Sequence, residues 1–242
     1  MTTILALGGG GFSMEPDNPL LDDFLLSLAL RRRGPDGLPR ICFVPTASGD
    51  AEGYVAEFEK AFAGRAETSA LRLFHLSELS VVDLRSYLLS QDVVFVGGGS
   101  TANMLALWRL HGLDDILREA AEAGVVLSGI SAGMNCWFEA SVTDSFGPLL
   151  PLPDGLGLLG GSACPHYDGE ADRRPTYLDL VGTGRLPAGY AADDGCGLLF
   201  RDGRLVEAVS SRPEARAFRV GPGGPTHDSP ALETPLTVRY LG

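Results

Sequence analysis

A serine between two glycines is the first feature of this sequence that could do chemistry. In Gly129-Ile130-Ser131-Ala132-Gly133, an apolar run typical of a buried parallel strand leads into a tight turn, and an apolar pattern that can continue as a helix follows. A serine at such a bend projects its hydroxyl clear of the sheet, as a nucleophile must. Small residues also fill ordinary strand-to-helix turns, so Ser131 needs supporting residues elsewhere in the chain.

A serine nucleophile needs a general base, because its hydroxyl is nearly inert at neutral pH. The chain has four histidines. His75 follows a strand-like run, His111 lies near a helix break, and His227 lies in a glycine- and proline-rich loop, so structural or solvated roles explain all three. His166 stands where a β-like run ends and a polar loop begins, which is where active-site residues gather. The sequence makes His166 the candidate base, with a structural histidine as the alternative.

Two further parts of a serine-type site can be found in the sequence. Asp193 and Asp194 directly precede a glycine and a strand, where one of them could orient the histidine; the alternative is a turn, which Asp-Gly favours in any case. The amide of Ala132 and the glycines that end "VFVGGGST" could hold an oxyanion. Each part lies on a loop or at the carboxyl end of a predicted strand.

Composition limits the classes of function. The 242 residues are 45% hydrophobic and 21% charged, enough for a full core, and we expect one catalytic domain over residues 1–242. The formal charge of -12 disfavours nucleic acid and membrane surfaces as partners. No apolar run is long enough to span a bilayer and the first residues do not resemble a secretion signal, so we expect a cytoplasmic protein.

The sequence contains no pattern that indicates a metal or a cofactor. The four cysteines are widely spaced without a C-x-x-C pair, which predicts buried free thiols. Residues 8–11 are glycines, but position 13 is a serine and the dinucleotide fingerprint is incomplete, so a tight turn is the favoured interpretation. The basic cluster at residues 31–33 fits the carboxyl end of a helix better than a binding patch.

The elements that must position these residues alternate between strands and helices. Apolar patterns predict strands at residues 2–9, 41–47, 70–76, 92–99 and 125–130, and helices at 22–33, 52–64 and 102–124. This alternation predicts an α/β fold with a mostly parallel sheet and helices on both faces. After about residue 150 the chain becomes rich in β-hairpin signals, with one hairpin turned at Asp202-Gly203, an irregular loop over 221–235, and a last strand over 236–241.

Four segments, "FVGGGSTANMLALW", "GISAGMNCWFEA", "CPHYDGEADRRP" and "ADDGCGLLF", together resemble the peptidase E family of serine peptidases. That family is related to aspartyl dipeptidase and cyanophycinase and has a fold like that of class I glutamine amidotransferases. The resemblance runs from the first strand to about residue 207. It implies Ser131 as nucleophile, His166 as base and Asp194 as the acidic third member, with oxyanion amides from Gly99 and Ala132.

The chain departs from the family pattern at Ser100, where the family usually carries asparagine, and the third member of the triad varies among relatives. Asp144 is a candidate for a substrate-side or supporting role. Arg173 and Arg174, which open a helical pattern close to His166, could bind a substrate carboxylate, as selection of Asp-X dipeptides would require. Their alternative role is that of solvated arginines at a helix start.

The predicted activity is hydrolysis of small peptides through an acyl-enzyme on Ser131, without a cofactor or a metal. Asp-X dipeptides are one candidate substrate, and a homodimer is the candidate assembly. Two alternatives stay open: a non-catalytic protein that binds a small ligand on the same fold, and a cyanophycinase-like hydrolase of an acidic polymer.

Overall fold

The computed structural model describes residues 1–33, 37–78, 83–224 and 230–242. A sheet of eight strands forms its centre, in the order β14-β11-β10-β1-β5-β4-β2-β3. These strands are β1 (Thr3–Leu7), β2 (Arg40–Val44), β3 (Glu67–Ala70), β4 (Val93–Val96), β5 (Val126–Ile130), β10 (Cys196–Arg201), β11 (Arg204–Ser210) and β14 (Val238–Tyr240). The five strands from β1 to β3 run parallel, whereas β10 joins β1 antiparallel.

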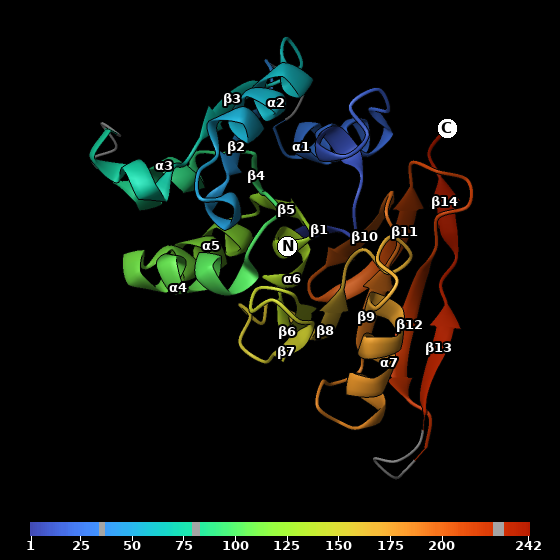
Figure 1. Cartoon of the computed structure of the whole chain (residues 1–242). Helices are drawn as coiled ribbons and strands as arrows, with labels where there is room; N and C mark the ends of the chain where they lie inside the picture. The colour runs from blue at the N-terminus through green and yellow to red at the C-terminus, as the bar shows by residue number, and fades with distance from the viewer. Residues whose placement is uncertain (34–36, 79–82, 225–229) are drawn as a thin grey trace.

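Helices cover both faces of the parallel part of this sheet, as the sequence predicts (Figure 1). Because successive side chains of a strand point to opposite faces, β1, β2 and β4 supply apolar residues to two separate clusters. One cluster packs against α1 (Leu20–Arg33) and α2 (Glu52–Phe62). The other packs against α3 (Leu84–Leu89), α4 (Thr101–His111) and α5 (Leu113–Glu122). Burial on both faces explains why these strands are nearly continuous apolar runs.

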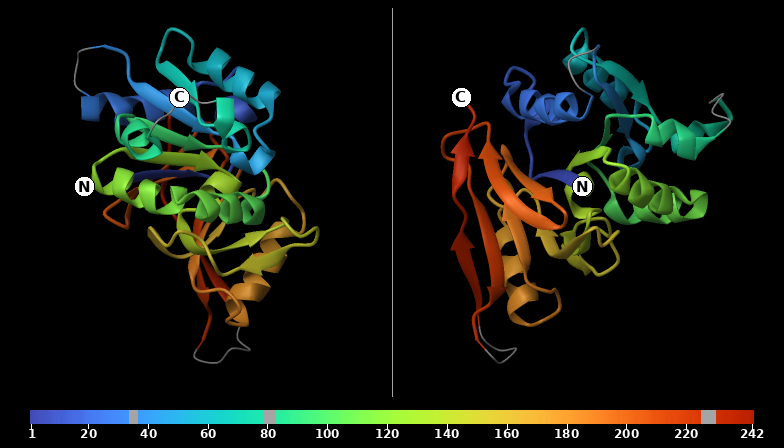
Figure 2. Two further views of the ribbon diagram at one scale, coloured as in Figure 1. Left: turned by 90° about the vertical axis from the view of Figure 1, so that its left-hand side faces the viewer. Right: turned by 180° about the vertical axis from the view of Figure 1, so that it is seen from behind.

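A second sheet of six strands has the order β13-β12-β9-β8-β6-β7. Its strands are β6 (Phe138–Thr143), β7 (Leu150–Leu152), β8 (Leu159–Cys164), β9 (Gly189–Ala192), β12 (Ala217–Pro222) and β13 (Ala231–Pro235). Helix α7 (Arg173–Gly182) packs on β12 and β13, at the opposite end of the molecule from α2 (Figure 2). Both sheets are mixed. In the second sheet, β6, β8 and β9 run parallel, and the remaining pairs are antiparallel.

The larger hydrophobic cluster continues from the first sheet into β6, β8 and β12 of the second. A core shared in this way is what one domain requires, and the single domain over residues 1–242 stays a prediction. Within the described residues, no helix is long and apolar enough to cross a membrane. All four cysteines are buried free thiols, as predicted.

Several predicted elements were wrong in extent. A strand was expected over 70–76, but strand β3 ends at Ala70, and the 3-10 helix η3 (Leu73–Glu78) follows it. The helix expected over 102–124 is two helices, because Gly112 adopts φ 66° between α4 and α5. The predicted loop over 221–235 contains β13. Its middle, including His227, lies outside the described residues.

Candidate active site

Ser131 stands at a sharp bend between strand and helix. Strand β5 is buried along its whole length, and Ser131 follows it with φ 58° and ψ -110°, before the single-turn helix α6 (Ala132–Asn135). A positive φ is uncommon for a residue with a side chain, and such strain gathers at functional sites. The Ser131 amide donates to the Leu7 carbonyl at the end of β1, at 3.2 Å, which fixes the bend to the neighbouring strand.

His166 occupies the equivalent place after β8, also with a positive φ, 52°. Its amide donates to the Gly8 carbonyl at 3.1 Å, so the loops that follow β1 and β8 are joined. Its ring nitrogen Nδ1 lies 2.6 Å from Oδ1 of Asp194, and each side chain is only 13% exposed. This hydrogen bond leaves Nε2 as the ring atom available for proton transfer.

The two adjacent aspartates have different surroundings. The Asp194 carboxylate holds His166, and the Asp194 amide donates to Oδ1 of Asp168 at 2.8 Å. The carboxylate of Asp193 instead accepts the amide of Arg216 at 2.9 Å. Burial raises the pKa of Asp193 to about 6, and the nearby negative charges of Asp168 and Asp194 add to the effect. Asp194 is therefore the carboxylate placed to orient the histidine.

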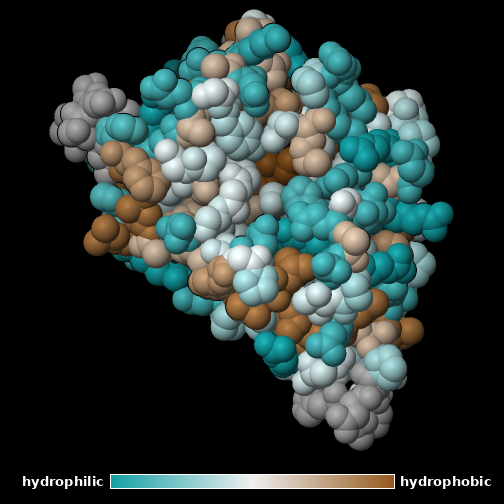
Figure 3. Space-filling model, viewed as in Figure 1, coloured by the Kyte–Doolittle hydropathy of each residue, from teal (hydrophilic) through white to brown (hydrophobic). Residues whose placement is uncertain are grey.

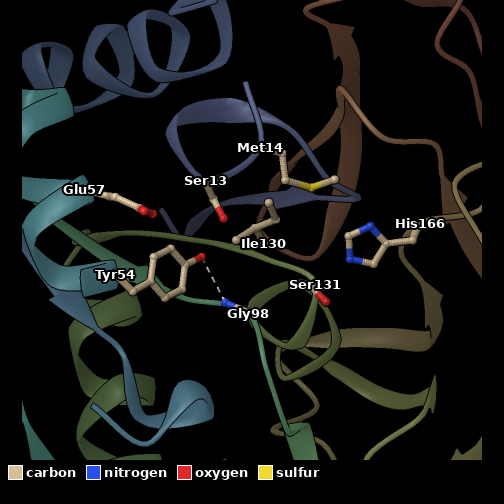
Figure 4. A pocket seen from close by; sticks show the side chains of 8 residues that line it. All are labelled: Ser13, Met14, Tyr54, Glu57, Gly98, Ile130, Ser131 and His166. Atoms are coloured by element: carbon tan, nitrogen blue, oxygen red, sulfur yellow. Dashed lines mark hydrogen bonds between the residues drawn. The ribbon is translucent and has the colours of Figure 1, made fainter. Parts of the chain in front are cut away.

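Ser131 and His166 face each other across a hollow of about 320 Å³ (Figure 4). Within the part of the chain that the structure describes, no hydrogen bond joins the Ser131 hydroxyl to the His166 ring. Catalytic hydrogen bonds are often longer in a free enzyme and shorten when substrate binds. The arrangement is thus suited to transfer of the serine proton once a substrate is present.

The two residues predicted to stabilise an oxyanion lie beside Ser131. Ala132 is the first residue of α6, where a helix amide has no intrahelical acceptor. Gly99 borders a second hollow next to Ser131 and has φ 134°, and a Cβ there would lie 2.2 Å from the Ala47 carbonyl oxygen. The amide of Gly98, in contrast, already donates to the Tyr54 hydroxyl at 3.3 Å.

The second hollow, also about 320 Å³, brings Asp144 and Arg173 to Ser131. Arg173 has a side chain only 3% exposed, and its guanidinium donates to both carboxylate oxygens of Glu170, at 2.7 and 3.2 Å. Its Nη2 also lies 3.7 Å from Asp144. The positive charge of Arg173 is therefore already matched by two carboxylates, which makes it a poor receptor for a substrate carboxylate.

Arg174 does not line this hollow. It forms an ion pair with Glu233 at 2.8 Å and lies over the rings of Tyr167 and Phe218. Ser100, the departure from the family pattern, lines the hollow and caps α4, because its hydroxyl accepts the Asn103 amide at 3.4 Å.

Four residues of the first hollow were not identified from the sequence: Ser13, Met14, Tyr54 and Glu57. Tyr54 and Glu57 are three positions apart on α2, and this spacing places two side chains on the same face of a helix. The helix follows the carboxyl end of β2, the edge where α/β sheets bind ligands. That combination is a signal that could have found them. Within the described residues, no group of three or more histidine, cysteine or acidic side chains could hold a metal.

Comparisons with known proteins match this chain to peptidases. The model of peptidase family S51 matches residues 4–208. The chain is 50% identical over its full length to the full-length Bacillus subtilis protein described as uncharacterized peptidase YgaJ. It is 32% identical to peptidase E of Streptomyces coelicolor over 75% of each chain.

Among solved structures, a peptidase from an acI-B1 Actinobacterium has the same fold. It superposes with a TM-score of 0.68 at 17% identity, over 98% of this chain and 95% of that one. The resemblance to the peptidase E family is confirmed by these matches. The chain belongs to peptidase family S51.

Proposed function

We propose that this peptidase is of the serine type and acts through a Ser131-His166-Asp194 triad. The observation that carries the proposal is the arrangement at Ser131. The serine stands at a strained bend and faces His166, whose Nδ1 atom lies 2.6 Å from the carboxylate of Asp194. Nucleophile, base and orienting carboxylate thus lie in the order that acyl transfer requires.

In the first step, Nε2 of His166 takes the proton of the Ser131 hydroxyl as its oxygen attacks the scissile carbonyl. Asp194 stabilises the imidazolium that forms and fixes the ring so that Nδ1 carries its proton. The negative charge on the substrate oxygen develops beside the amides of Gly99 and Ala132, which act as the oxyanion donors. The imidazolium then protonates the leaving amine, and the peptide bond breaks.

Deacylation uses the same groups in the same order. A water that enters in place of the leaving amine gives a proton to His166 and attacks the acyl carbon. The proton then returns to the Ser131 oxygen as the ester breaks. The products are an acid and an amine, and the enzyme returns to its starting state without a cofactor.

Small peptides are the proposed substrates. The hollows on the two sides of Ser131, about 320 Å³ each, are at the lower end of the size of small-molecule sites. A preference for Asp-X dipeptides is not supported. The guanidinium of Arg173 is already paired with Glu170 and Asp144, and that of Arg174 is paired with Glu233.

A fluorophosphonate probe tests the mechanism, because it forms a covalent bond with a serine that is activated as a nucleophile. The wild-type protein should be labelled, and labelling should disappear in Ser131→Ala. Ser13→Ala is the matched control, since Ser13 lines the same hollow without standing at the bend, and it should still be labelled. A folded wild-type protein that resists labelling would instead favour a non-catalytic ligand-binding protein.

A further inference from the structure

Among the described residues that line the hollow shared by Ser131 and His166, one is acidic, Glu57, and none is a lysine or an arginine. Glu57 is exposed on α2, and its carboxylate lies at the end of the hollow opposite His166 (Figure 4). Within the described residues no ion pair neutralises it. Lys60 lines an adjoining hollow that Asp17 and Glu57 also border, so two acidic side chains face one lysine there. Glu57 thus presents a negative charge without an ion-pair partner among the described residues to a substrate that enters this hollow.

The walls between Ser131 and Glu57 suit the stem of a long side chain. Met14 and Ile130 are apolar, and the ring of Tyr54 lies on the path towards Glu57 (Figure 4). The aliphatic parts of lysine and arginine cover apolar surface while the charged end stays hydrated, and a cation gains further from an aromatic ring. The hydroxyls of Ser13 and Tyr54 add hydrogen-bond acceptors near the carboxylate.

The charges on the other side of Ser131 favour the same kind of substrate. In the second hollow the buried Arg173 is matched by Glu170 and Asp144, so that side also carries more negative than positive charge. Among the described residues, neither hollow offers an unpaired lysine or arginine to an acidic residue of a substrate.

We infer that Glu57 makes this site select peptides with a positively charged side chain, lysine or arginine, next to the scissile bond. The inference rests on the proposed function, because it takes Ser131 as the nucleophile beside which that side chain lies. It differs from an Asp-X preference in the sign of the charge that the enzyme prefers.

Citrulline provides the matched test substrate, since it has nearly the shape of arginine without its charge. The kcat/KM values of Arg-Leu and Leu-Arg are compared with those of Cit-Leu and Leu-Cit. Arginine should be preferred about fivefold at one of the two positions, the size expected of a largely hydrated ion pair. At about 0.15 M salt, where distant charges are screened, this ratio should fall to about one in Glu57→Gln. Glu59→Gln changes a neighbouring acid of α2 that lines neither hollow, and it should keep the preference.

Equal rates for arginine and citrulline at both positions, in an enzyme that cleaves these peptides, would overturn the inference and leave the triad intact. Retention of the preference in Glu57→Gln would overturn it as well. Binding of the same peptides to Ser131→Ala, measured by calorimetry, separates the two proposals. If the wild-type protein neither cleaves peptides nor reacts with a fluorophosphonate, yet Ser131→Ala binds the arginine peptide more tightly than the citrulline peptide, the subsite is supported and the mechanism is rejected.

Discussion

At the scale of single residues, Asp193 and Asp194 show how neighbours of the same type acquire different roles. The carboxylate of Asp194 lies against the histidine ring, while that of Asp193 turns away to the Arg216 amide. The sequence identified the pair but left open which member orients His166, because side-chain direction in a loop depends on tertiary partners. Likewise, the sequence proposed Arg173 as a receptor for a substrate carboxylate, and only the structure shows that its guanidinium already binds the carboxylate of Glu170.

The first prediction is that Asp194→Asn lowers kcat by about 10²- to 10⁴-fold, the range set by loss of the orienting carboxylate in serine triads. An amide at this position can favour the wrong tautomer of His166 and cannot stabilise the imidazolium. Steady-state kinetics on a cleaved dipeptide measure the effect. Asp193→Asn is the matched control and should change kcat far less. A large loss in the control with a silent Asp194→Asn would transfer the role to Asp193.

The second prediction concerns stability and pH. The pKa of Asp193 is raised from its ordinary 3.8 to about 6, first by burial. The contribution of this group to stability is therefore fully present below about pH 3.8 and is lost as the pH rises through about 6.

Asp193→Asn removes this pH dependence and keeps an acceptor for the Arg216 amide. The variant should unfold with a free energy similar to wild type at low pH, and be more stable by about 1–3 kcal/mol at pH 8. Urea unfolding at pH 4 and pH 8 measures the difference. A stability difference that is the same at both pH values would show that ionisation of Asp193 is not its cause.

At the scale of elements, the bend at Ser131 depends on close packing between β4, β5 and α6. A Cβ on Gly133 would lie 2.2 Å from the Val96 carbonyl oxygen, and one on Gly129 would lie 2.7 Å from the same atom. These glycines therefore let α6 approach the sheet and keep Ser131 at the sheet edge. The sequence pattern predicted this bend because the strand, the glycines and the serine are contiguous.

The third prediction is that Gly133→Ala destabilises the protein by about 1–3 kcal/mol, the usual cost of an overpacked core, and reduces fluorophosphonate labelling of Ser131. Gly53→Ala is the matched change in another helix, α2, where a Cβ would meet nothing within 4 Å. It should raise stability by up to about 1 kcal/mol, because alanine is the better helix former. Thermal unfolding compares the two variants, and equal effects would contradict this account.

Elements made from distant segments were harder to predict than the bend. Strand β3 has the sequence "ETSA", is partly exposed and lacks an apolar pattern, whereas the buried leucines after it mimic a strand. The second sheet pairs β9 with β12 and β6 with β8, and no local pattern specifies such partners. The alternation of strands and helices before residue 130 was predictable because each βα unit carries its own periodicity.

At the scale of the whole molecule, the chain has an excess of negative charge. The chain carries a formal charge of -12, and hydrophilic residues cover much of the face shown in Figure 3. Such a field attracts cations and repels anions before any contact forms, and salt weakens it. Its effect on substrate choice therefore adds to that of Glu57 and has its own signature, a dependence on ionic strength.

The last prediction uses three dipeptides that differ in net charge. From about 0.01 M to 0.15 M salt the screening length falls from about 30 to 8 Å, so distant charges lose their influence. The kcat/KM of Arg-Leu should fall by about two- to tenfold over this range, that of Leu-Leu should stay nearly constant, and that of Asp-Leu should rise. In Glu57→Gln the salt dependence for Arg-Leu should persist, because the substitution removes only one of the many charges that produce the field. A common slope for all three peptides would mean that salt acts on the enzyme itself, and that the field of the molecule does not select its substrates.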